Sequence, residues 1–477
     1  PPSVIKAFNN VVALKVATLL NRRFDSVTGL AFIIFCSSVV NPYILYNVGF
    51  QLSIGAVLAI VLLYKPLEQL SILKKIPCKL RSIIVITIVS QLGTLPILAY
   101  CFNKISILGV VFNLPVIILI AIILPMLFLL ILFALIPVNI LGLFSLIIAP
   151  LLQLLIYINS LSLGSNLGEI YIKTPTQLDI IIYYLILIVI FKKVKNYKLK
   201  KIINVVILSL MMVSFTLKLE DIRELRYTFF DVGQGDCSLI QSPFNRKSIL
   251  IDGGKEKDDD VLKLLLKSRV NNIDIVILSH SHEDHINGLI EVVENFDVEY
   301  LLVGTLEFES DSQEQLLDIC KAKGTKVVVL REGDTLVVNN NITIHVLNPS
   351  NVPIAGFNDE NNRSLVAFIE CGKSKILYTG DIEYGIEKVI SKKNIKHPDI
   401  LKVPHHGSDT SSSTVFLDWL KPKYGIIQVG KNRFGHPSPL TIEKFETRGI
   451  NYYRNDLDGA IIIRYSNGNY NIKKMIE

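Results

Sequence analysis

The sequence predicts two folds in one chain, a polytopic α-helical membrane bundle over residues 1–220 and an α/β domain over residues 221–477. Of the 49 Lys and Arg residues, 18 lie in the first part and 31 in the second; of the 42 Asp and Glu residues, 5 lie in the first and 37 in the second. The net charges are therefore +13 and −6. The overall charge of +7 thus comes entirely from the first part and says nothing about a basic nucleic-acid-binding face on the second part.

Seven apolar stretches in the first part predict membrane-spanning helices, because crossing a bilayer takes about 20 apolar residues. One of them, residues 105–137, would be about 50 Å long as a helix, which exceeds the hydrocarbon thickness. Pro115 and Pro125 interrupt it, so we predict a single crossing with a broken or re-entrant end. The predicted spans cover residues 27–41, 44–64, 82–100, 105–137, 141–162, 179–191 and 202–217.

Three Lys/Arg-rich connections, at residues 21–25, 65–81 and 192–201, predict the loops that face the cytoplasm. The number of crossings between the second and third connections must be even. Three other spans lie between them, so the 105–137 run must cross an odd number of times. The last span then ends at residue 217 outside the cytoplasm. We therefore expect a multi-pass protein of the cell membrane whose second half is extracytoplasmic.

Sparse polar residues within the predicted spans allow two interpretations. In a bilayer such groups face the bundle interior, where they hydrogen-bond between helices or line a water path. Prolines inside the spans free backbone carbonyls, which is tolerated only where protein or a cavity receives them. These features are compatible with a conduit without deciding for one. The polar residues are Gln51, Ser53, Gln91, Thr94 and Asn113.

From about residue 226 the pattern changes to short β-branched runs separated by Gly, Asp and Asn turns. Helical patterns at 260–269, 312–323 and 440–448 alternate with some of them, which predicts an α/β domain with a mostly strand-built core. The predicted strands are RYTFFDV, SILIDGG, DIVILSH, YLLVG, KVVVL, ITIHVL, SLVAFI, KILYTGD, ILKVPHHG, YGIIQVG and AIIIRY.

The stretch LSHSHEDHINGL, residues 278–289, contains three of the eight histidines in the chain. It follows the buried-strand pattern IDIVIL, and we expect the histidines to lie on a loop. Imidazoles and carboxylates so close together are a natural way to hold two divalent cations. His280 and His282 would point to one ion, and Asp284 and His285 to the second. A polar surface loop is the alternative.

Further ligands are expected at other strand ends. Asp381 follows KILYTG and is suited to bridging two cations, and His405 and His406 follow ILKV in VPHHGS. The spacing does not decide which of these two histidines is the ligand, and the other could contact a phosphate. The six cysteines form neither a CxxC pair nor a regular framework, so neither a zinc ribbon nor a disulfide scaffold is predicted.

The HxHxDH motif, a later strand-end Asp and a final His resemble the signature of the metallo-β-lactamase fold, an αββα sandwich with its dinuclear site at the edge between the sheets. With FFDVGQGDCSLIQ, ILIDGG, LKVPHHGS and GHPSP, and with GFQLS and SQLGTLP in the membrane half, the chain resembles the ComEC family of competence proteins over nearly its whole length. That family also has an N-terminal soluble domain that this sequence does not contain. The sequence, which opens at PPSVIKAF, is accordingly expected to be a fragment.

The resemblance implies a DNA uptake channel of natural transformation that passes single-stranded DNA through the lipid bilayer, with the lactamase-like domain degrading the non-transported strand. The sequence has no Walker A motif, so a separate cytoplasmic ATP-dependent motor is expected, together with an external DNA-receptor protein. Carried over by position, His280 and His282 match the first-metal ligands, Asp284 and His285 the second, Asp381 the bridging residue, and His405 or His406 the last ligand.

One departure from the family pattern concerns the first metal. Many enzymes of this fold place another His between HxHxDH and the bridging Asp, where this sequence has only His345, a predicted strand residue. The comparable position falls in residues 358–366, where the weak substitutes are Asn361, Asn362 or Ser364. Oxygen ligands would favour Mn²⁺ or Mg²⁺ relative to Zn²⁺.

Residues outside the motif have less specific roles. Asp236, like Asp231 and Gln234 in the same glycine-rich turn, and Asp252 either orient a ligand His or cap turns. His436, in the proline-stiffened FGHPSP loop, is predicted to face substrate and to protonate the leaving oxygen.

The chemistry that we predict is metal-assisted phosphodiester hydrolysis, with Asp284 and His436 as catalytic residues. Two alternatives remain. The domain could hydrolyse a different substrate, since the fold does not select one. It could instead only guide or gate DNA, retaining a weak metal site for structure.

Overall fold

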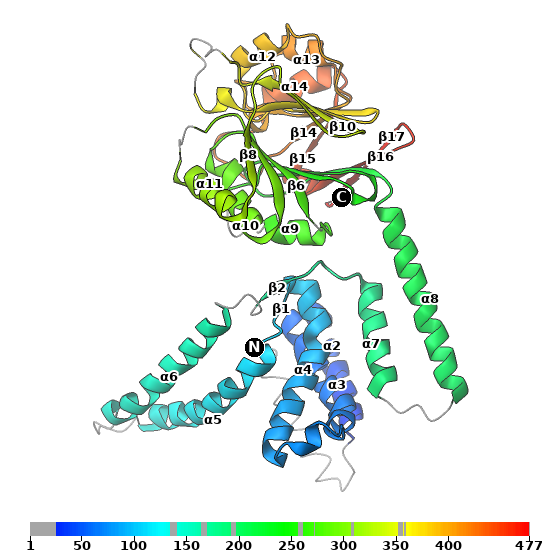
Figure 1. Cartoon of the computed structure of the whole chain (residues 1–477), viewed down its shortest axis with the longest axis vertical. Helices are drawn as coiled ribbons and strands as arrows, with labels where there is room; N and C mark the ends of the chain where they lie inside the picture. Colours follow the sequence, from blue (N-terminus) through cyan, green and yellow to red (C-terminus); the bar gives the residue numbers. More distant parts are fainter. Residues whose placement is uncertain are drawn as a thin grey trace. The chain divides into compact units, whose positions relative to one another are not determined.

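The computed structural model of the chain divides into two compact units, Pro1–Phe215 and Thr216–Glu477 (Figure 1). Each unit is built around its own contacts. The structure describes residues 25–133, 141–163, 169–191, 197–255, 261–270, 272–306, 310–351, 356 and 359–476. Most of the predicted cytoplasmic connection at 21–25 and part of that at 192–201 lie outside these residues.

The first unit is helical, with a helix at each predicted span. Four helices are long and apolar enough to cross a membrane, namely Val48–Glu68, Cys78–Phe102, Gly109–Ile131 and Leu199–Asp221. Shorter apolar helices cover Ser26–Val40, Leu146–Leu161 and Gln177–Phe191. The elements are α2 (Ser26–Val40), η1 (Pro42–Tyr46), α3 (Val48–Glu68), η2 (Leu73–Lys75), α4 (Cys78–Phe102), β1 (Lys104–Ile105), α5 (Gly109–Phe133), α6 (Leu141–Leu163), β2 (Ile170–Tyr171), α7 (Gln177–Phe191) and α8 (Tyr197–Asp221).

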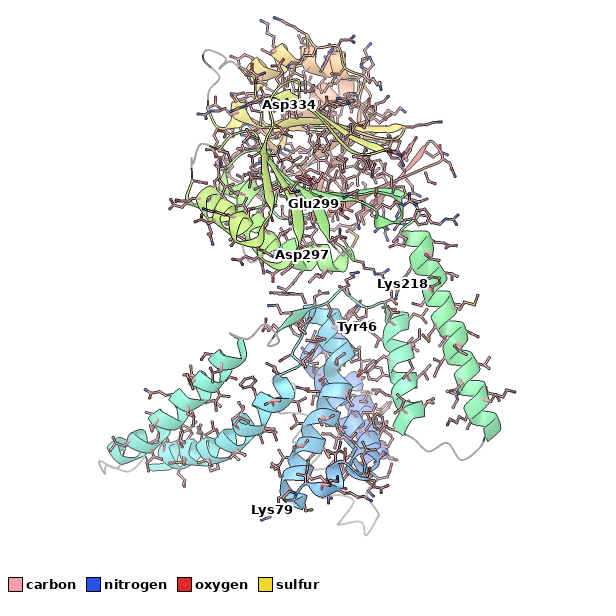
Figure 2. The ribbon with its side chains drawn as sticks, in the orientation of Figure 1. Tyr46, Lys79, Lys218, Asp297, Glu299 and Asp334 are labelled. Carbon is pink, nitrogen blue, oxygen red and sulfur yellow. The ribbon has the colours of Figure 1, made fainter. Side chains whose placement is uncertain are left out.

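The surfaces of these helices suit a lipid environment. Large apolar side chains such as Phe35 and Phe128 are 66% and 62% exposed, which would be costly in water but not against lipid. Lysines gather instead in the predicted cytoplasmic connection between α3 and α4, where Lys79 lies at the start of α4 (Figure 2). Apolar helices and charged connections together indicate a membrane protein.

The predicted break in the 105–137 run is wrong for the part that the structure describes. Helix α5 is continuous from Gly109 to Phe133 with Pro115 and Pro125 both inside it. Residues 134–140 lie outside the described residues. Prolines are tolerated in membrane helices because neighbouring groups can satisfy the freed carbonyls.

A short antiparallel strand pair joins the segment before α5 to the segment after α6. β1 pairs antiparallel with β2, and the Asn103 side chain donates to the Ile172 carbonyl at 3.1 Å and to Thr174 Oγ1 at 2.7 Å. The chain therefore leaves α4 and enters α7 at the same end of the helical unit. This arrangement agrees with one crossing by α5 and one by α6, the parity that the charged connections require.

Helices α3, α4 and α7 pack closely through glycine and tyrosine. A Cβ on Gly55 would lie 2.8 Å from the Gly93 carbonyl oxygen, so only glycine allows this approach of α3 to α4. Pro96 has no N–H for the Leu92 carbonyl, which instead accepts a 2.9 Å hydrogen bond from the Tyr183 hydroxyl of α7. A freed carbonyl is thus received by protein, one of the two outcomes expected from the sequence.

The polar residues in these helices make local hydrogen bonds where the structure shows their partners. Gln51 Nε2 donates to the Leu45 carbonyl at 2.8 Å, and Thr94 Oγ1 donates to the Ser90 carbonyl at 2.9 Å. A cavity of about 330 Å³ lies among α2, α3, α4 and α7, and its lining is apolar except for Gln51 and Tyr184. Such a lining does not suit a phosphate chain, so this cavity gives no support to a DNA conduit.

The second unit consists of two mixed β-sheets packed face to face (Figure 1). The first sheet has the order β17 (Asn469–Lys474), β16 (Ile461–Ser466), β3 (Leu225–Phe229), β4 (Ser238–Gln241), β5 (Ser248–Ile251), β6 (Ile273–Leu278), β7 (Val298–Val303) and β8 (Lys326–Val329). The second has the order β15 (Asn451–Arg454), β14 (Tyr424–Ile427), β13 (Ile400–Lys402), β12 (Ser374–Tyr378), β11 (Val366–Cys371), β10 (Ile342–Asn348) and β9 (Thr335–Asn339).

Helices cover the outer face of each sheet, which completes an αββα sandwich (Figure 1). The helices on the first sheet are α9 (Val261–Lys267), α10 (Glu283–Asn295) and α11 (Asp311–Lys323), and those on the second are α12 (Tyr384–Ile390), α13 (Thr414–Leu420) and α14 (Pro439–Thr447). The short helix α15 (Asn455–Asp458) and the 3₁₀ turns η3 (Pro243–Asn245), η4 (Asn361–Arg363) and η5 (Pro404–Gly407) complete the unit. The predicted α/β sandwich is confirmed.

Apolar layers between the sheets and beneath the helices hold the sandwich together. Between the sheets, inward-facing residues such as Tyr227, Ile277 and Ile344 are fully buried. Beneath α12–α14 a second cluster includes Phe416 and Phe445, also fully buried. Burying each such side chain contributes about 1.5–3 kcal/mol, so the sheets form a rigid base for the loops at their edge.

The sheet topology brings those loops to one edge. β5, β6 and β7 are parallel neighbours in the first sheet, and β12, β13 and β14 are parallel neighbours in the second. The carboxyl ends of parallel strands meet at the same edge of a sheet. The segments after β5, β6, β12, β13 and β14 therefore lie close together, and they contain Asp252, the HxHxDH motif, Asp381, the His405–His406 pair and His436.

Candidate metal centre

The HxHxDH motif spans a loop and the start of a helix. His280 and His282 follow β6 on the loop, whereas Asp284 and His285 lie in the first turn of α10. The expectation that the histidines lie on a loop was therefore wrong for His285. His282 is the N-cap residue, and an acidic first turn favours a helix N-terminus. The helix forms because its buried apolar residues recur at helical spacing, namely Ile286, Leu289, Ile290 and Val293.

Two close backbone approaches fix the start of α10. A Cβ on Gly288 would overlap the Gly253 carbonyl after β5, and a Cβ on Gly235 would overlap the Asp284 carbonyl. Gly235 also has a φ of 138°, which glycine adopts without strain. The turn FDVGQGD and the end of β5 thereby hold the carboxylate of Asp284 in place.

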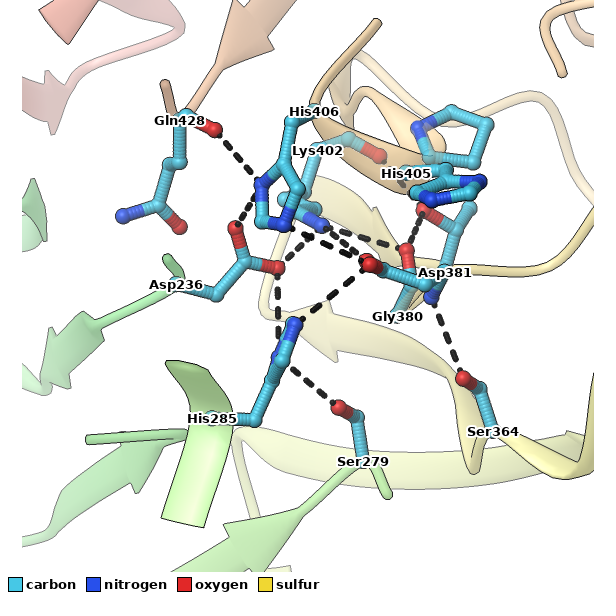
Figure 3. A network of polar contacts seen from close by, with 12 residues as sticks. Asp236, Ser279, His285, Ser364, Gly380, Asp381, Lys402, His405, His406 and Gln428 are labelled. Carbon is cyan, nitrogen blue, oxygen red and sulfur yellow. Dashed lines mark hydrogen bonds and ion pairs between the residues drawn. The ribbon is translucent and has the colours of Figure 1, made fainter. Parts of the chain in front are cut away.

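His285 is fully buried and lies among carboxylates (Figure 3). Its Nδ1 lies 2.9 Å from Asp252 Oδ2, which in turn accepts a hydrogen bond from the Ser279 hydroxyl. Its Nε2 lies 3.4 Å from Asp381 Oδ2 and 3.9 Å from Asp284 Oδ1, and it has no hydrogen-bond partner in the described structure. An unpartnered buried ring nitrogen that faces two carboxylates is the arrangement expected around a cation.

The histidine pair after β13 divides between the inside and the outside of the site. His406 is buried, its Nδ1 lies 2.8 Å from the Gln428 carbonyl oxygen, and its Nε2 lies 3.3 Å from Oδ2 of both Asp284 and Asp381. His405 is partly exposed, and its Nδ1 lies 3.7 Å from Glu383 Oε1. His406 therefore belongs to the cluster, and His405 lies at its rim.

Lys402 is buried directly beneath this cluster (Figure 3). Its Nζ forms an ion pair with Asp236, lies 3.4 Å from Asp381 Oδ1 and donates to the Gly380 carbonyl at 3.1 Å. A charged residue at the end of the apolar strand ILK was the available sequence signal, and we did not predict a site role for it. Asp236, expected only as a turn or orienting residue, contributes to the same network.

The other side of the site contains His280 and His282. His280 is buried, and its Nε2 lies 3.0 Å from His282 Nδ1. His282 Nε2 in turn lies 3.2 Å from Glu360 Oε2. Glu360 stands beside the three predicted substitutes for the missing histidine and was not predicted, although its carboxylate supplies an oxygen donor.

Two of the three predicted substitutes have other partners, whereas the buried Oδ1 of Asn361 has no hydrogen-bond partner in the described structure. Ser364 Oγ accepts from the Asp381 N–H at 3.1 Å and lies 3.4 Å from His280 Nδ1, so it supports both residues. The Asn362 side-chain oxygen accepts from the Glu383 N–H at 3.0 Å. His345 lies within β10, as predicted, with Nδ1 3.1 Å from Thr335 Oγ1.

Within the described residues, four groups of three side chains could each hold a metal ion. The groups are His280, His285 and Asp381; Asp284, His285 and His406; Asp236, Asp381 and His406; and Asp236, Asp252 and His285. Five of the predicted site residues thus converge, while His282, His405 and His436 do not join such a group. A donor set of imidazoles and carboxylates fits a divalent cation.

Comparison with known families agrees with this division of the chain. Residues 1–196 match the model of the competence protein family, and residues 230–431 match that of the metallo-beta-lactamase superfamily. The chain joins a competence domain to a metallo-beta-lactamase domain. Both parts of the predicted resemblance are confirmed.

Relatives of this chain include ComE operon protein 3 of Bacillus subtilis, 27% identical over 98% of this chain and 62% of that protein. Competence protein ComA of Neisseria gonorrhoeae is 27% identical over 50% of this chain and 32% of its own length. The chain thus spans less than two thirds of either relative. The metallo-beta-lactamase fold protein YhfI of Bacillus subtilis is 16% identical, covers 51% of this chain and all of its own, and superposes with a TM-score of 0.37.

In the candidate metal centre, the positive charges of two histidines offset the negative charges of the neighbouring carboxylates. Burial opposes a charge on His406, yet the carboxylates of Asp381 and Asp236 raise its pKa to about 10. For His285 burial again opposes the charge, and the same Asp381 with Asp252 raises its pKa well above the usual value. Protonated imidazoles therefore stand among these carboxylates at neutral pH.

The pKa values of the other histidines at the site are shifted by different causes. Burial lowers the pKa of His280 well below its usual value, so this imidazole is neutral and available to bind a cation. A hydrogen bond to Glu360 raises the pKa of His282. Burial, together with the neighbouring His405, lowers the pKa of His436.

The sequence left two roles open for Asp252 and Asp231, either orienting a histidine or capping a turn, and the structure shows their contacts. Asp252 orients His285 through its ring nitrogen, the arrangement that fixes a ligand tautomer. Asp231 instead accepts a 3.3 Å hydrogen bond from the Gly233 N–H and supports its own turn.

Proposed function

We propose that this chain is part of a DNA uptake channel that passes single-stranded DNA across the membrane, while its metallo-beta-lactamase domain hydrolyses phosphodiester bonds of the non-transported strand. The observation that carries the proposal is the buried His–Asp cluster in a domain joined to a competence domain. The names of the relatives support competence as the setting. Phosphate esters are the bonds that such a system meets.

In this proposal two divalent cations are held by the residues predicted from the sequence. Asp284, His285 and His406 would hold one ion, His280 and His282 would hold the other, and Asp381 would serve as a ligand to both. When bound, the cations lower the pKa of water and offset the charge that develops on phosphoryl oxygens. The unpartnered Nε2 of His285 and the N/O donor set fit such ions.

The ligands of the first centre support a choice among Mn²⁺, Mg²⁺ and Zn²⁺. In the described structure no histidine from outside the HxHxDH motif lies beside His282, where Glu360 supplies an oxygen instead. A set richer in oxygen favours Mn²⁺ or Mg²⁺ relative to Zn²⁺. We propose Mn²⁺ or Mg²⁺ as the working ion.

Two side chains at the site, those of Asp284 and His436, have roles in this proposal besides those of the other metal ligands. Asp284, whose pKa burial would raise but His285 and His406 lower, stays ionised and accepts hydrogen bonds at the site. His436 has a lowered pKa and is neutral at pH 7, which suits a hydrogen bond to phosphate better than the donation of a proton to the leaving oxygen. We therefore assign His436 to substrate contact.

The membrane arrangement completes the proposal. The three Lys/Arg-rich connections favour seven crossings, with the metallo-beta-lactamase domain outside the cytoplasm. Its net charge of −6 favours transient rather than static engagement of DNA. We propose a cytoplasmic ATP-dependent motor and an external DNA-receptor protein as partners, as the resemblance implies.

Metal binding is expected to release protons. At pH 7.5 both His285 and His406 are protonated, so a cation displaces about one to two protons per chain. Because the pKa of His406 is about 10, the apparent affinity rises as pH increases toward that value and falls as pH decreases. Titration calorimetry of Mn²⁺ in two buffers of different ionisation enthalpy measures the released protons. An affinity unchanged between pH 6.5 and 9 would contradict the assignment.

The activity itself is tested with the full chain in detergent. Treated with a chelator and then resupplied with Mn²⁺, Mg²⁺ or Zn²⁺, it is expected to cleave single- or double-stranded DNA only when a metal is present. Metal binding without cleavage would favour the second candidate, a domain that only guides or gates DNA. The incomplete histidine set of the first centre is the observation that favours this alternative.

A further inference from the structure

The loop after β14 holds an exposed aromatic ring beside the metal centre. Phe434 is 76% exposed, and its ring stacks on that of His436 with centroids 5.9 Å apart and planes at 21°. His436 lies 5.6 Å from His405, which lies 6.3 Å from His406 in the buried cluster. Four rings thus form a row from solvent to the site.

The loop is held rigidly although its ring is exposed. Asn432 Oδ1 accepts from the N–H groups of Phe434 at 3.0 Å and His436 at 3.1 Å, and its Nδ2 donates to the carbonyls of Gly430 at 2.9 Å and His436 at 2.8 Å. The backbone on both sides of Phe434 is therefore fixed, and its ring lies against that of His436. Binding residues are concentrated on loops that a rigid scaffold positions, so this ring in the loop after β14 is a candidate for ligand contact.

Positive charge accompanies the ring. Lys431 and Arg433 flank it and are exposed, and neither forms an ion pair within the part of the chain that the structure describes. These two positive charges lie in a domain whose net charge is −6. An aromatic face between two cations matches a nucleotide, which offers a base and phosphates to the same surface.

We propose that residues 431–436 form a nucleobase-stacking site for single-stranded DNA. A base next to the phosphate to be hydrolysed stacks on Phe434, and Lys431 and Arg433 contact flanking phosphates. This proposal rests on the proposed function. It specifies that the DNA bound at the hydrolytic site is an unpaired strand, because bases within a duplex are already stacked on each other. A lipid headgroup would need the two cations but no open ring beside a buried metal centre.

The test uses a fluorescent reporter at the ring. The chain has one tryptophan, Trp419, so the variant with Phe434→Trp and Trp419→Phe has a single emitter at the site. In the full chain without divalent metal, oligothymidine is expected to quench it saturably. An abasic oligomer of equal length and a blunt duplex are expected to quench the emission less. Their affinities should be about 5- to 100-fold lower than that of oligothymidine.

A matched control places the reporter on another exposed aromatic next to an arginine. Phe244 is 50% exposed, with Arg246 5.9 Å from its ring, and it precedes β5 at the edge opposite the site. Phe244→Trp, also with Trp419→Phe, is expected to show no quenching that depends on bases. Lys431→Gln with Arg433→Gln should lower the log–log salt slope of binding by about 0.7 per lost contact for both single-stranded oligomers.

Equal quenching by oligothymidine, abasic oligomer and duplex, or no quenching at all, would overturn the stacking site. Metal-dependent cleavage is measured separately on the chain with Phe434 intact. Quenching without cleavage would retain the stacking site while the hydrolytic function fails. Cleavage without base-dependent quenching would retain hydrolysis and remove the stacking site.

Discussion

Replacing His406 by alanine is expected to reduce metal-dependent hydrolysis by more than about 100-fold, whereas His405→Ala should cost less than about tenfold. Loss of a residue that only supports a metal ligand costs 10- to 100-fold, so loss of a ligand should exceed that range. His406 Nε2 is 3.3 Å from two carboxylates of the cluster, and its other ring nitrogen is fixed by the Gln428 carbonyl. His405 joins none of the candidate metal groups.

The two variants are a matched pair, because both positions have left-handed backbone, with φ of 48° at His405 and 52° at His406. Alanine therefore meets similar strain at each, and a difference in activity reports on the side chain. Metal content, measured by mass spectrometry after chelation and reloading, should fall in His406→Ala only. Equal losses of activity and metal in both variants would show that the assignment of the last ligand to His406 is wrong.

The sequence predicted the order of elements in the metallo-beta-lactamase domain well, because buried strands have distinctive β-branched runs. The strands that it missed have mixed patterns. β9, β15 and β17 lie at sheet edges, whereas β4 lies inside the first sheet. Their sequences TLVVN, NYYR, NYNIKK and SLIQ combine apolar with polar residues. Helix α10 was not predicted because the metal motif reads as a loop, although the helical spacing from Ile286 to Val293 was available. Helices α12 and α13 were not predicted either.

The site was predictable only in part. Motif residues such as His285 and Asp381 could be found because their types and strand-end positions are distinctive. Lys402 and Asp236 could not be paired, since they lie 166 positions apart and meet only when the two sheets pack. The choice between His405 and His406 depends on burial, which adjacent residues of one type do not reveal.

Replacing Lys402 by methionine is expected to destabilise the chain without bound metal by about 3–5 kcal/mol, the cost of leaving a buried charge without its partner. Burial would lower the pKa of Lys402, but Asp236 and Asp381 raise it, so the ammonium is charged and neutralises these carboxylates. Methionine fills similar space without the charge. Thermal unfolding of the full chain in detergent and chelator measures the loss.

Lys396→Met is the matched control, because Lys396 pairs with Glu370 at 2.8 Å but its side chain is 66% exposed. An exposed pair is worth about 0–1 kcal/mol, so little change is expected. Mn²⁺ should stabilise Lys402→Met more than the unchanged chain, since a divalent cation supplies the positive charge that Asp236 and Asp381 then lack. If Lys402→Met unfolds at the same temperature as Lys396→Met in chelator, Lys402 does not neutralise the carboxylates, and the compensation must come from the protonated His285 and His406.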